Sequence, residues 1–274
     1  MMVEVLVHFV APALVGVLIG IASGLLGIGG GTVMVPIFRL AFGMSATVST
    51  ATSLFAIIPT SISGAISHVK GKTCIPALGI AAGLGGACLS PVGVWLAQLS
   101  PDWLVMLAAA LIIGYSAINM FKKAFKLRPA GQPAAGVDAA APTADDSSLS
   151  RKQLLQGAAI GLVAGLASGY VGVGGGFIMV PLMLSIIGIP MRKASGTSLI
   201  AVMILAIPGV IEQGIIGNIN YLAGIAIVIG TIPGAAIGAR LVTKVPERTL
   251  RLLFGCFLIV AAVMLVLNEV GIFG

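Results

Sequence analysis

Long apolar stretches alternate with short polar ones along almost the whole chain. A helix needs about 20 mostly apolar residues to cross a bilayer, and eight stretches meet this requirement. They lie at 5–26, 46–68, 75–98, 103–121, 153–172, 194–216, 221–241 and 249–270. Two shorter apolar stretches, 32–43 and 177–189, follow the first and the fifth of these. The pattern predicts an all-α polytopic membrane protein with about eight full-length transmembrane helices and two short, broken or re-entrant helices.

The alternation stops between residues 127 and 150, where Ala, Pro, Ser and Asp dominate without any apolar periodicity. A segment of this composition buries too little apolar surface to pack into a core. We therefore expect a flexible cytoplasmic linker at 127–150, between a first transmembrane repeat at 1–126 and a second at 151–274.

The two halves are copies of one unit. A shift of 145 residues aligns SGLLGIGGGTVMVP, starting at Ser23, with SGYVGVGGGFIMVP, starting at Ser168. Thirteen of the 32 positions from 23 to 54 are identical after this shift, including a TSL triplet that recurs at 197–199. Self-similarity at a fixed spacing indicates that both halves share one arrangement of helices.

The basic residues decide how the two copies are oriented, because Lys and Arg concentrate on the cytoplasmic side of membrane proteins. With four crossings per half, the basic residues at 192–193 and 240–251 would lie opposite the basic flanks of the linker. With five crossings they lie on the same side, and only Arg39 needs a separate explanation. An odd number of crossings predicts two inverted repeats with both termini outside, an arrangement typical of secondary transporters.

The composition fixes the solvent and removes several functions. Hydrophobic residues make up 58% of the chain and charged residues 8%, so lipid must cover most of the surface. The net charge of +7 comes with only 5% aromatic residues, which does not favour a nucleic-acid partner. Cys74, Cys88 and Cys256 have no metal-ligand spacing. We expect no metal and no cofactor, and we interpret the cysteines as packing residues.

Two glycine runs interrupt the apolar pattern, each directly before a short helix. The glycines concerned are Gly27, Gly29, Gly30 and Gly31 in the first half and Gly172, Gly174, Gly175 and Gly176 in the second. Such runs leave backbone N–H groups without partners, and in a membrane these must face protein or a wet cavity. Free amides at a helix N-terminus suit an anion. The alternative is that the glycines only allow close helix packing.

Polar side chains near these runs are further candidates for binding. The hydroxyl pairs Thr52-Ser53 and Thr197-Ser198 occupy equivalent positions near the start of the following helix and can donate to an oxyanion, or bond to helix carbonyls instead. Arg39 is a guanidinium within a membrane segment and is therefore either a ligand-binding residue or an interfacial anchor. His68 and Glu212 lie near helix ends, where we expect solvation.

The paired glycine motifs with their following MVP, the TSL triplets and the duplicated glycine-rich third helices resemble the TauE/SafE sulfite exporter family. The resemblance covers both halves and leaves out only the linker. It implies a bacterial inner-membrane, multi-pass permease for a sulfur-containing anion such as sulfite or an organosulfonate.

Three other functions remain open at this point. A structural or regulatory membrane subunit would use the glycines for packing only and would need no ligand. A permease for another small solute, including a cation bound by loop carbonyls, is a second alternative. An intramembrane enzyme would require a metal cluster or an activated nucleophile within the spans, and we predict no catalytic residues and no enzyme.

Overall fold

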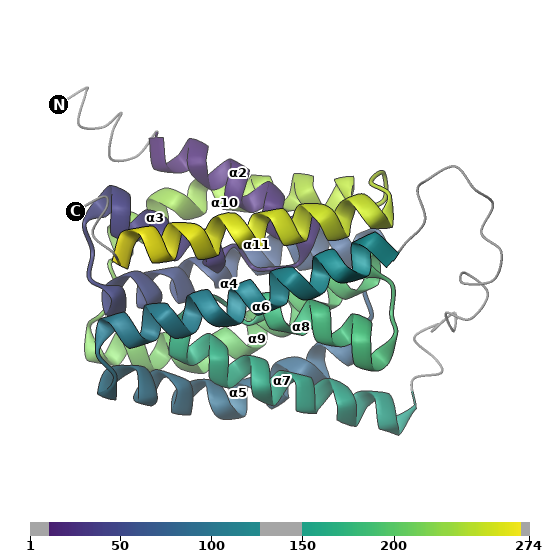
Figure 1. Cartoon of the computed structure of the whole chain (residues 1–274), viewed down its shortest axis with the longest axis horizontal. Coiled ribbons are helices and arrows are strands. Elements are labelled where there is room, and N and C mark those ends of the chain that lie inside the picture. The colour runs from purple at the N-terminus through teal and green to yellow at the C-terminus, as the bar shows by residue number, and fades with distance from the viewer. Residues whose placement is uncertain (1–10, 127–149, 270–274) are drawn as a thin grey trace.

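The computed structural model describes residues 11–126 and 150–269, which form helices joined by short turns (Figure 1). The first half contains α2 (Ala11–Leu26), α3 (Gly31–Phe42), α4 (Ala46–Lys70), α5 (Pro76–Leu99) and α6 (Asp102–Lys126). The second half contains α7 (Arg151–Val171), α8 (Gly176–Leu182), the π-helical η2 (Met183–Ile187), α9 (Met191–Ile216), α10 (Tyr221–Leu241) and α11 (Glu247–Glu269). Apart from Ser150, the predicted linker lies outside the described residues, as does the start of the first predicted span.

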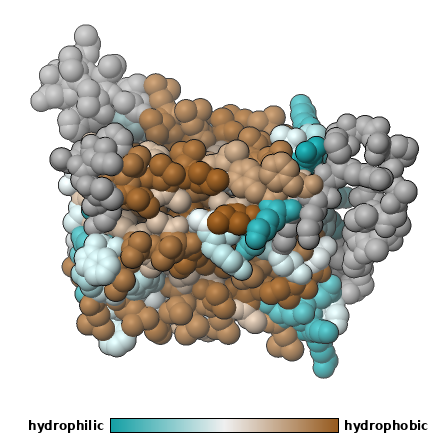
Figure 2. Space-filling view, viewed as in Figure 1, coloured by the Kyte–Doolittle hydropathy of each residue, from teal (hydrophilic) through white to brown (hydrophobic). Residues whose placement is uncertain are grey.

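The prediction of an all-α polytopic membrane protein is confirmed. Seven of the described helices, α4 to α7 and α9 to α11, are long and apolar enough to cross a bilayer. The described part of α2 is a further apolar helix of 16 residues. Figure 2 shows an apolar band across the middle of the molecule, with hydrophilic residues gathered toward its ends. This distribution fits a bilayer around the middle of the bundle.

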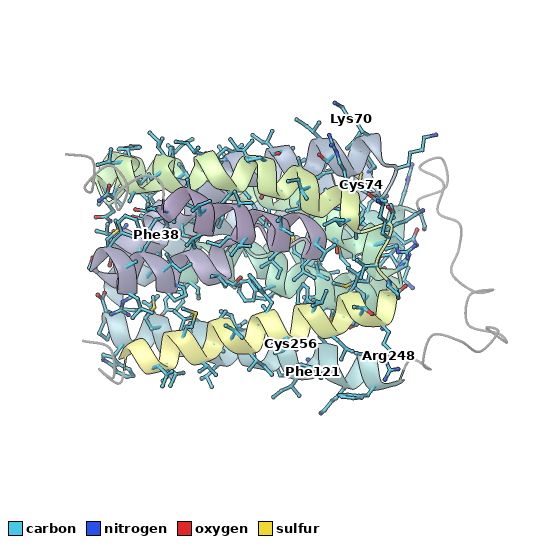
Figure 3. All side chains as sticks on the ribbon, turned by 90° about the horizontal axis from the view of Figure 1, so that it is seen from above. Phe38, Lys70, Cys74, Phe121, Arg248 and Cys256 are labelled. Carbon is cyan, nitrogen blue, oxygen red and sulfur yellow. The ribbon has the colours of Figure 1, made fainter. Side chains whose placement is uncertain are left out.

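The two halves run in opposite directions through the bundle. In Figure 1, α2 begins and α11 ends at the left, whereas α6 ends and α7 begins at the right. We call the right end the linker end. Lys70, Cys74 and Arg248 also lie at the linker end, while Phe38 lies toward the other end (Figure 3). The repeats are therefore inverted relative to each other, as the distribution of basic residues predicts.

Helices of the two halves exchange partners. The helix α2 packs along α10, and its equivalent α7 packs along α5. Glycines line both of these helix–helix contacts. A Cβ at Gly161 of α7 would lie 1.9 Å from the Ala82 carbonyl oxygen, and one at Gly230 of α10 would lie 1.8 Å from that of Ala13, so neither position has room for a side chain. Such close approach of two backbones is possible only where a side chain is missing.

The exchange divides most of the molecule into two equivalent bundles. We call α2, α3, α4 and α10 the first bundle, and α7, α8 with η2, α9 and α5 the second bundle. The first bundle contacts the second where α4 packs against α9. The remaining two helices, α6 and α11, pack against each other. Each bundle therefore combines three consecutive helical segments of one half with one helix of the other.

The short helices are half-crossings. The helix α3 has 12 residues, and α8 with η2 has the same combined length, so each is roughly 18 Å long. A hydrocarbon core is about 30 Å thick, so each short helix starts inside the bilayer and ends at one face. The glycine runs precede these two starting points.

The interpretation of the cysteines as packing residues is wrong for two of the three. Cys88 on α5 and Cys256 on α11 are exposed on the bundle surface, and Cys74 is half-buried in the turn before α5. A hydropathy pattern gives the depth of a residue but not the direction in which its side chain points. Neither exposed side chain is therefore part of the packed interior of the described bundle.

Candidate anion-binding site between the glycine loops

Each glycine run folds into a tight left-handed turn between two helices. Residues 27–30 form loop A between α2 and α3, and residues 172–175 form loop B between α7 and α8. The backbone φ angles are positive at Gly27 (76°), Gly29 (81°) and Gly30 (87°) in loop A, and at Gly172 (72°), Gly174 (87°) and Gly175 (66°) in loop B. Residues with a Cβ rarely adopt these angles, which explains why glycine occupies these positions in both halves.

The turns leave several backbone amides without acceptors. Within the described part of the chain, the N–H groups of residues 28–31 in the first half and 173–175 in the second form no hydrogen bond. The N–H groups of Gly27 and Gly172 instead donate to the carbonyls of Ser23 and Ser168, and these bonds close the last turns of α2 and α7. Both loops are buried, and an unpaired amide in a membrane interior costs several kcal/mol. The amides therefore need a ligand or water.

The two loops meet in the middle of the protein. A Cβ at Gly31 would lie 2.6 Å from the Val173 carbonyl oxygen, and one at Gly176 would lie 2.4 Å from that of Gly27. The side chains of Ile28 and Val173, one from each loop, are fully buried. Since α3 and α8 begin at the contact, two helix N-termini with their partial positive charges converge at one place.

Buried hydroxyls without partners surround the loops. Ser23, Thr32, Ser53, Ser61 and Ser168 are all completely buried, and within the described residues their side-chain oxygens form no hydrogen bond. The Ser61 oxygen is 3.4 Å from a Cβ placed on Gly29, and the Cβ of Ser23 is 3.7 Å from one placed on Gly30. A buried hydroxyl is normally bonded, so this group also calls for a ligand.

Our sequence prediction did not include most of these hydroxyls. Ser23 and Ser168 are the first residues of the repeated motif, and a glycine follows each of them. Their repetition in both halves is the sequence signal that could have identified them as site residues. Thr32 and Ser61 are not repeated as hydroxyls, because Phe177 and Ala206 stand at the equivalent positions. Only the structure shows that these two side chains lie near loop A.

The four predicted hydroxyls separate into different roles. Thr52 accepts a hydrogen bond of 3.0 Å from the backbone N–H of Asn220, and Thr197 accepts one of 2.9 Å from that of Ile75. These equivalent bonds hold the starts of α10 and α5. Ser198 donates to the Gly27 carbonyl over 2.7 Å and so fixes loop A. Ser53 alone among the four has a hydroxyl without a partner.

Arg39 is not brought together with the glycine loops. It lies in the last turn of α3, about 12 Å along the helix from Gly31, and its side chain is partly buried and engaged in interactions. This position is near the face opposite the linker end, where a long cationic side chain reaches the membrane interface.

His68 differs from the sequence prediction of a solvated side chain. It is completely buried in the last turns of α4, because α2 and the start of α9 pack beside it. Its Nε2 lies 2.8 Å from the Gly24 carbonyl oxygen and its Nδ1 lies 2.7 Å from the Thr73 hydroxyl. A histidine is thus bonded to the helix that leads into loop A. Glu212, near the end of α9, is only partly buried.

Comparison with known proteins gives a consistent result. The sequence profile described as "Sulfite exporter TauE/SafE" matches residues 12–265. The chain is 28% identical to "Probable membrane transporter protein YunE" of Bacillus subtilis, covering 97% of this chain and 99% of that protein. It is also 28% identical to "Probable membrane transporter protein YdhB" of the same species and to a "Probable membrane transporter protein" of Haemophilus influenzae, covering 87% and 93% of this chain and 92% and 97% of those proteins. No solved structure matches the chain.

Proposed function

Because the chain belongs to the TauE/SafE sulfite exporter family, we propose that it exports a small sulfur-containing anion, sulfite or an organosulfonate, across a bacterial inner membrane. The observation that carries this proposal is the meeting of two loops whose amides and surrounding hydroxyls have no partners. Donors without acceptors, gathered at two helix N-termini, are complementary to an oxyanion.

The ligand sits between loop A and loop B in this proposal. Amides of both loops donate to its oxygens, together with four hydroxyls, those of Ser23, Thr32, Ser53 and Ser168. Thr52 and Thr197 stay outside the binding site because they hold helix starts, and Arg39 stays outside because it lies near one face. The sulfite and sulfonate groups have several acceptor oxygens, which suits the unpaired amides and hydroxyls around the loops.

Alternating access follows from the exchanged helices. Loop A belongs to the first bundle and loop B to the second, so rocking one bundle against the other at the α4–α9 contact opens the loop contact toward one face and then the other. The structure has both loops buried, which corresponds to the occluded stage of such a cycle. The cycle forms and breaks no covalent bond, so the protein is a carrier and not an enzyme.

The basic residues orient the carrier in the membrane. Lys70 and Arg248 lie at the linker end together with the basic starts of α7 and α9. The positive-inside rule places this end in the cytoplasm, so the anion enters there for export.

A binding measurement with serine variants tests this proposal. Thermal unfolding of the detergent-purified full chain is followed with sulfite, sulfate, thiosulfate, sulfoacetate, taurine and chloride. A ligand of the folded state stabilises it by about 2.7 kcal/mol at a hundred times its Kd. We expect selective stabilisation by sulfite or an organosulfonate. Replacing both Ser23 and Ser168 by alanine should weaken anion binding by roughly a hundredfold or more, because each of the two lost bonds to a charged group is worth about 1.5–3 kcal/mol.

Ser90→Ala is the matched control for the serine pair. Among the described residues, the Ser90 hydroxyl is also completely buried and without a partner, but it faces Gly209 on α9 and not the loops. This variant should bind the anion as the wild type does. If no anion shifts the unfolding curve of the wild type, the loops are packing elements and a structural or regulatory subunit becomes the better account.

A further inference from the structure

His68 is hydrogen-bonded on both ring nitrogens by groups that suit either of its charge states. The Gly24 carbonyl can only accept, so Nε2 carries a hydrogen in both states. In the neutral ring, Nδ1 accepts from the Thr73 hydroxyl. In the protonated ring, Nδ1 donates to that hydroxyl, whose own hydrogen turns to the His68 carbonyl oxygen, 3.3 Å away. A proton can therefore be taken up without leaving a buried polar group unpaired.

The repeat provides an internal comparison for this pair. The equivalents of His68 and Thr73 are Gln213 and Asn218, and the Asn218 amide donates to the Gln213 side-chain oxygen over 2.8 Å. The turns also match, because the backbone N–H of Thr73 donates to the His68 carbonyl and that of Asn218 to the Gln213 carbonyl, both over 3.0 Å. The fold thus requires a linked polar pair at this position, but only the copy at the linker end has one that titrates.

His68 contacts both chain segments that hold loop A. Gly24, whose carbonyl it binds, lies three residues before Gly27. On the other side, a Cβ at Gly196 would lie 2.8 Å from the His68 ring carbon Cγ. Gly196 precedes Thr197 and Ser198, and the Ser198 hydroxyl binds the Gly27 carbonyl. A charge on the imidazole therefore appears directly behind the proposed anion site.

Within the described residues, no carboxylate is among the hydrogen-bond or ion-pair partners of His68. The helix α2 contributes Gly24, the turn before α5 contributes Thr73, and α9 contributes Gly196. Arg192 and Lys193 lie one turn earlier on α9, where Arg192 donates to the Val245 carbonyl. Glu247, which contacts the start of α9, is engaged by Arg251 and by the backbone N–H of Met191. A bound anion is thus the partner that would balance a proton on His68.

A pocket lies at the end of α4, beside the residues next to the histidine. It has a volume of about 400 Å³ and is lined by Ser67, Lys70, Gly71, Ala239, Arg240 and Thr243. Ser67 is the chain neighbour of His68, and Ala239 lies beside Gly24, since a Cβ on that glycine would be 2.8 Å from the Ala239 nitrogen. The pocket therefore reaches the chain neighbour of His68, so a proton from water at the linker end has a short route to the imidazole.

We propose that His68 is a proton-binding site of the carrier and that a proton is taken up there when the anion binds between the loops. This inference rests on the proposed function. The proton comes from water at the linker end and adds to Nδ1, and no covalent bond to the anion forms. By linkage, the proton raises the affinity for the anion by the same factor as the anion raises the affinity for the proton. A dianion carried with one proton keeps one negative charge, so an inside-negative membrane potential still favours its export.

The test measures proton uptake during anion binding. Calorimetric titrations with sulfite and with sulfoacetate are run in two buffers of different ionisation enthalpy, at several values between about pH 6 and 8, where histidine ordinarily titrates. The wild type is compared with His68→Gln and with His68→Gln/Thr73→Asn, which transplants the pair of the second half. Protons taken up by sulfite itself cancel in the difference between the proteins.

We expect the wild type to take up as much as one proton more per anion than either variant. Its affinity should fall by up to about tenfold per pH unit at high pH, while the affinity of the variants changes less. If the variants bind the anion with the proton uptake and pH profile of the wild type, His68 is not the proton site, although the carrier function stands. If neither anion binds the wild type at any pH, the proposed function and this inference both fail.

Discussion

Neighbouring hydroxyls on α4 show how finely residue roles are divided. Thr52 accepts the backbone N–H of Asn220, whereas the buried Ser53 hydroxyl has no partner in the described part of the chain. The repeated TSL triplet identifies both positions from sequence but cannot say which hydroxyl is used. That distinction depends on the rotation of each side chain about α4, which sequence does not specify.

Substitution of Thr52 should separate stability from binding. Thr52→Val keeps the shape of the side chain but removes the acceptor of the Asn220 amide, so unfolding should become easier by about 1–3 kcal/mol. Thr32→Val removes a buried hydroxyl beside loop A that has no partner and should leave stability nearly unchanged. Thermal unfolding and anion titration are measured on both variants. Lower stability with normal affinity for Thr52→Val, and the reverse for Thr32→Val, is the expected pattern; equal behaviour would contradict it.

Residue-level prediction fails where burial depends on neighbours from elsewhere in the chain. His68 lies two residues from the end of α4, and sequence alone therefore indicates contact with water. It is buried because Gly24 from α2 and Gly196 from α9 pack around it. The positive φ angles of the two loops, by contrast, follow from local glycine content and are consistent with the sequence-based reading.

At the scale of helices, the hydropathy pattern predicts where elements lie but not which ones touch. The short helices were expected at 32–43 and 177–189, and they occupy Gly31–Phe42 and Gly176–Ile187. The exchange of α2 and α7 between the bundles was not predicted, because the apolar surfaces of different helices are chemically similar and hydropathy does not specify which helices pack together. Glycines four residues apart, as at 157, 161, 165 and 169, are the available signal for such seams.

The seam between α5 and α7 should tolerate no added side chain. A Cβ at Gly161 would lie 1.9 Å from a backbone oxygen of α5, so Gly161→Ala forces the helices apart. We expect a loss of about 1–3 kcal/mol in unfolding free energy. Gly114→Ala on α6 is the control, since nothing lies within 4 Å of its Cβ position. A Gly161→Ala protein that unfolds at the temperature of the control would show that the seam is not tightly packed.

At the scale of the whole molecule, inversion and exchange together bring two equivalent loops to one central contact. The inversion could be predicted from the distribution of basic residues. The repetition of the glycine runs indicates two equivalent loops, but it does not show that the loops contact each other. The extents proposed for the two repeats, 1–126 and 151–274, remain predictions, since repeat similarity alone defines them. Equivalent helix pairs on both sides of the contact are what a rocking carrier requires.

The central claim is that loops A and B bind one anion together, and a calorimetric titration of glycine variants tests it most directly. The variant Gly30→Ala/Gly175→Ala is compared with Gly43→Ala/Gly188→Ala, where φ is also positive (61° and 78°) but no atom lies within 4 Å of the Cβ position. Both pairs carry similar backbone strain, of the order of 1–3 kcal/mol per residue. We predict one sulfite or sulfoacetate bound per chain for the wild type and the control pair, and affinity reduced at least about tenfold for the loop pair, as expected from losing one charge-assisted bond. Equal affinity of the loop pair and the control pair would contradict the account.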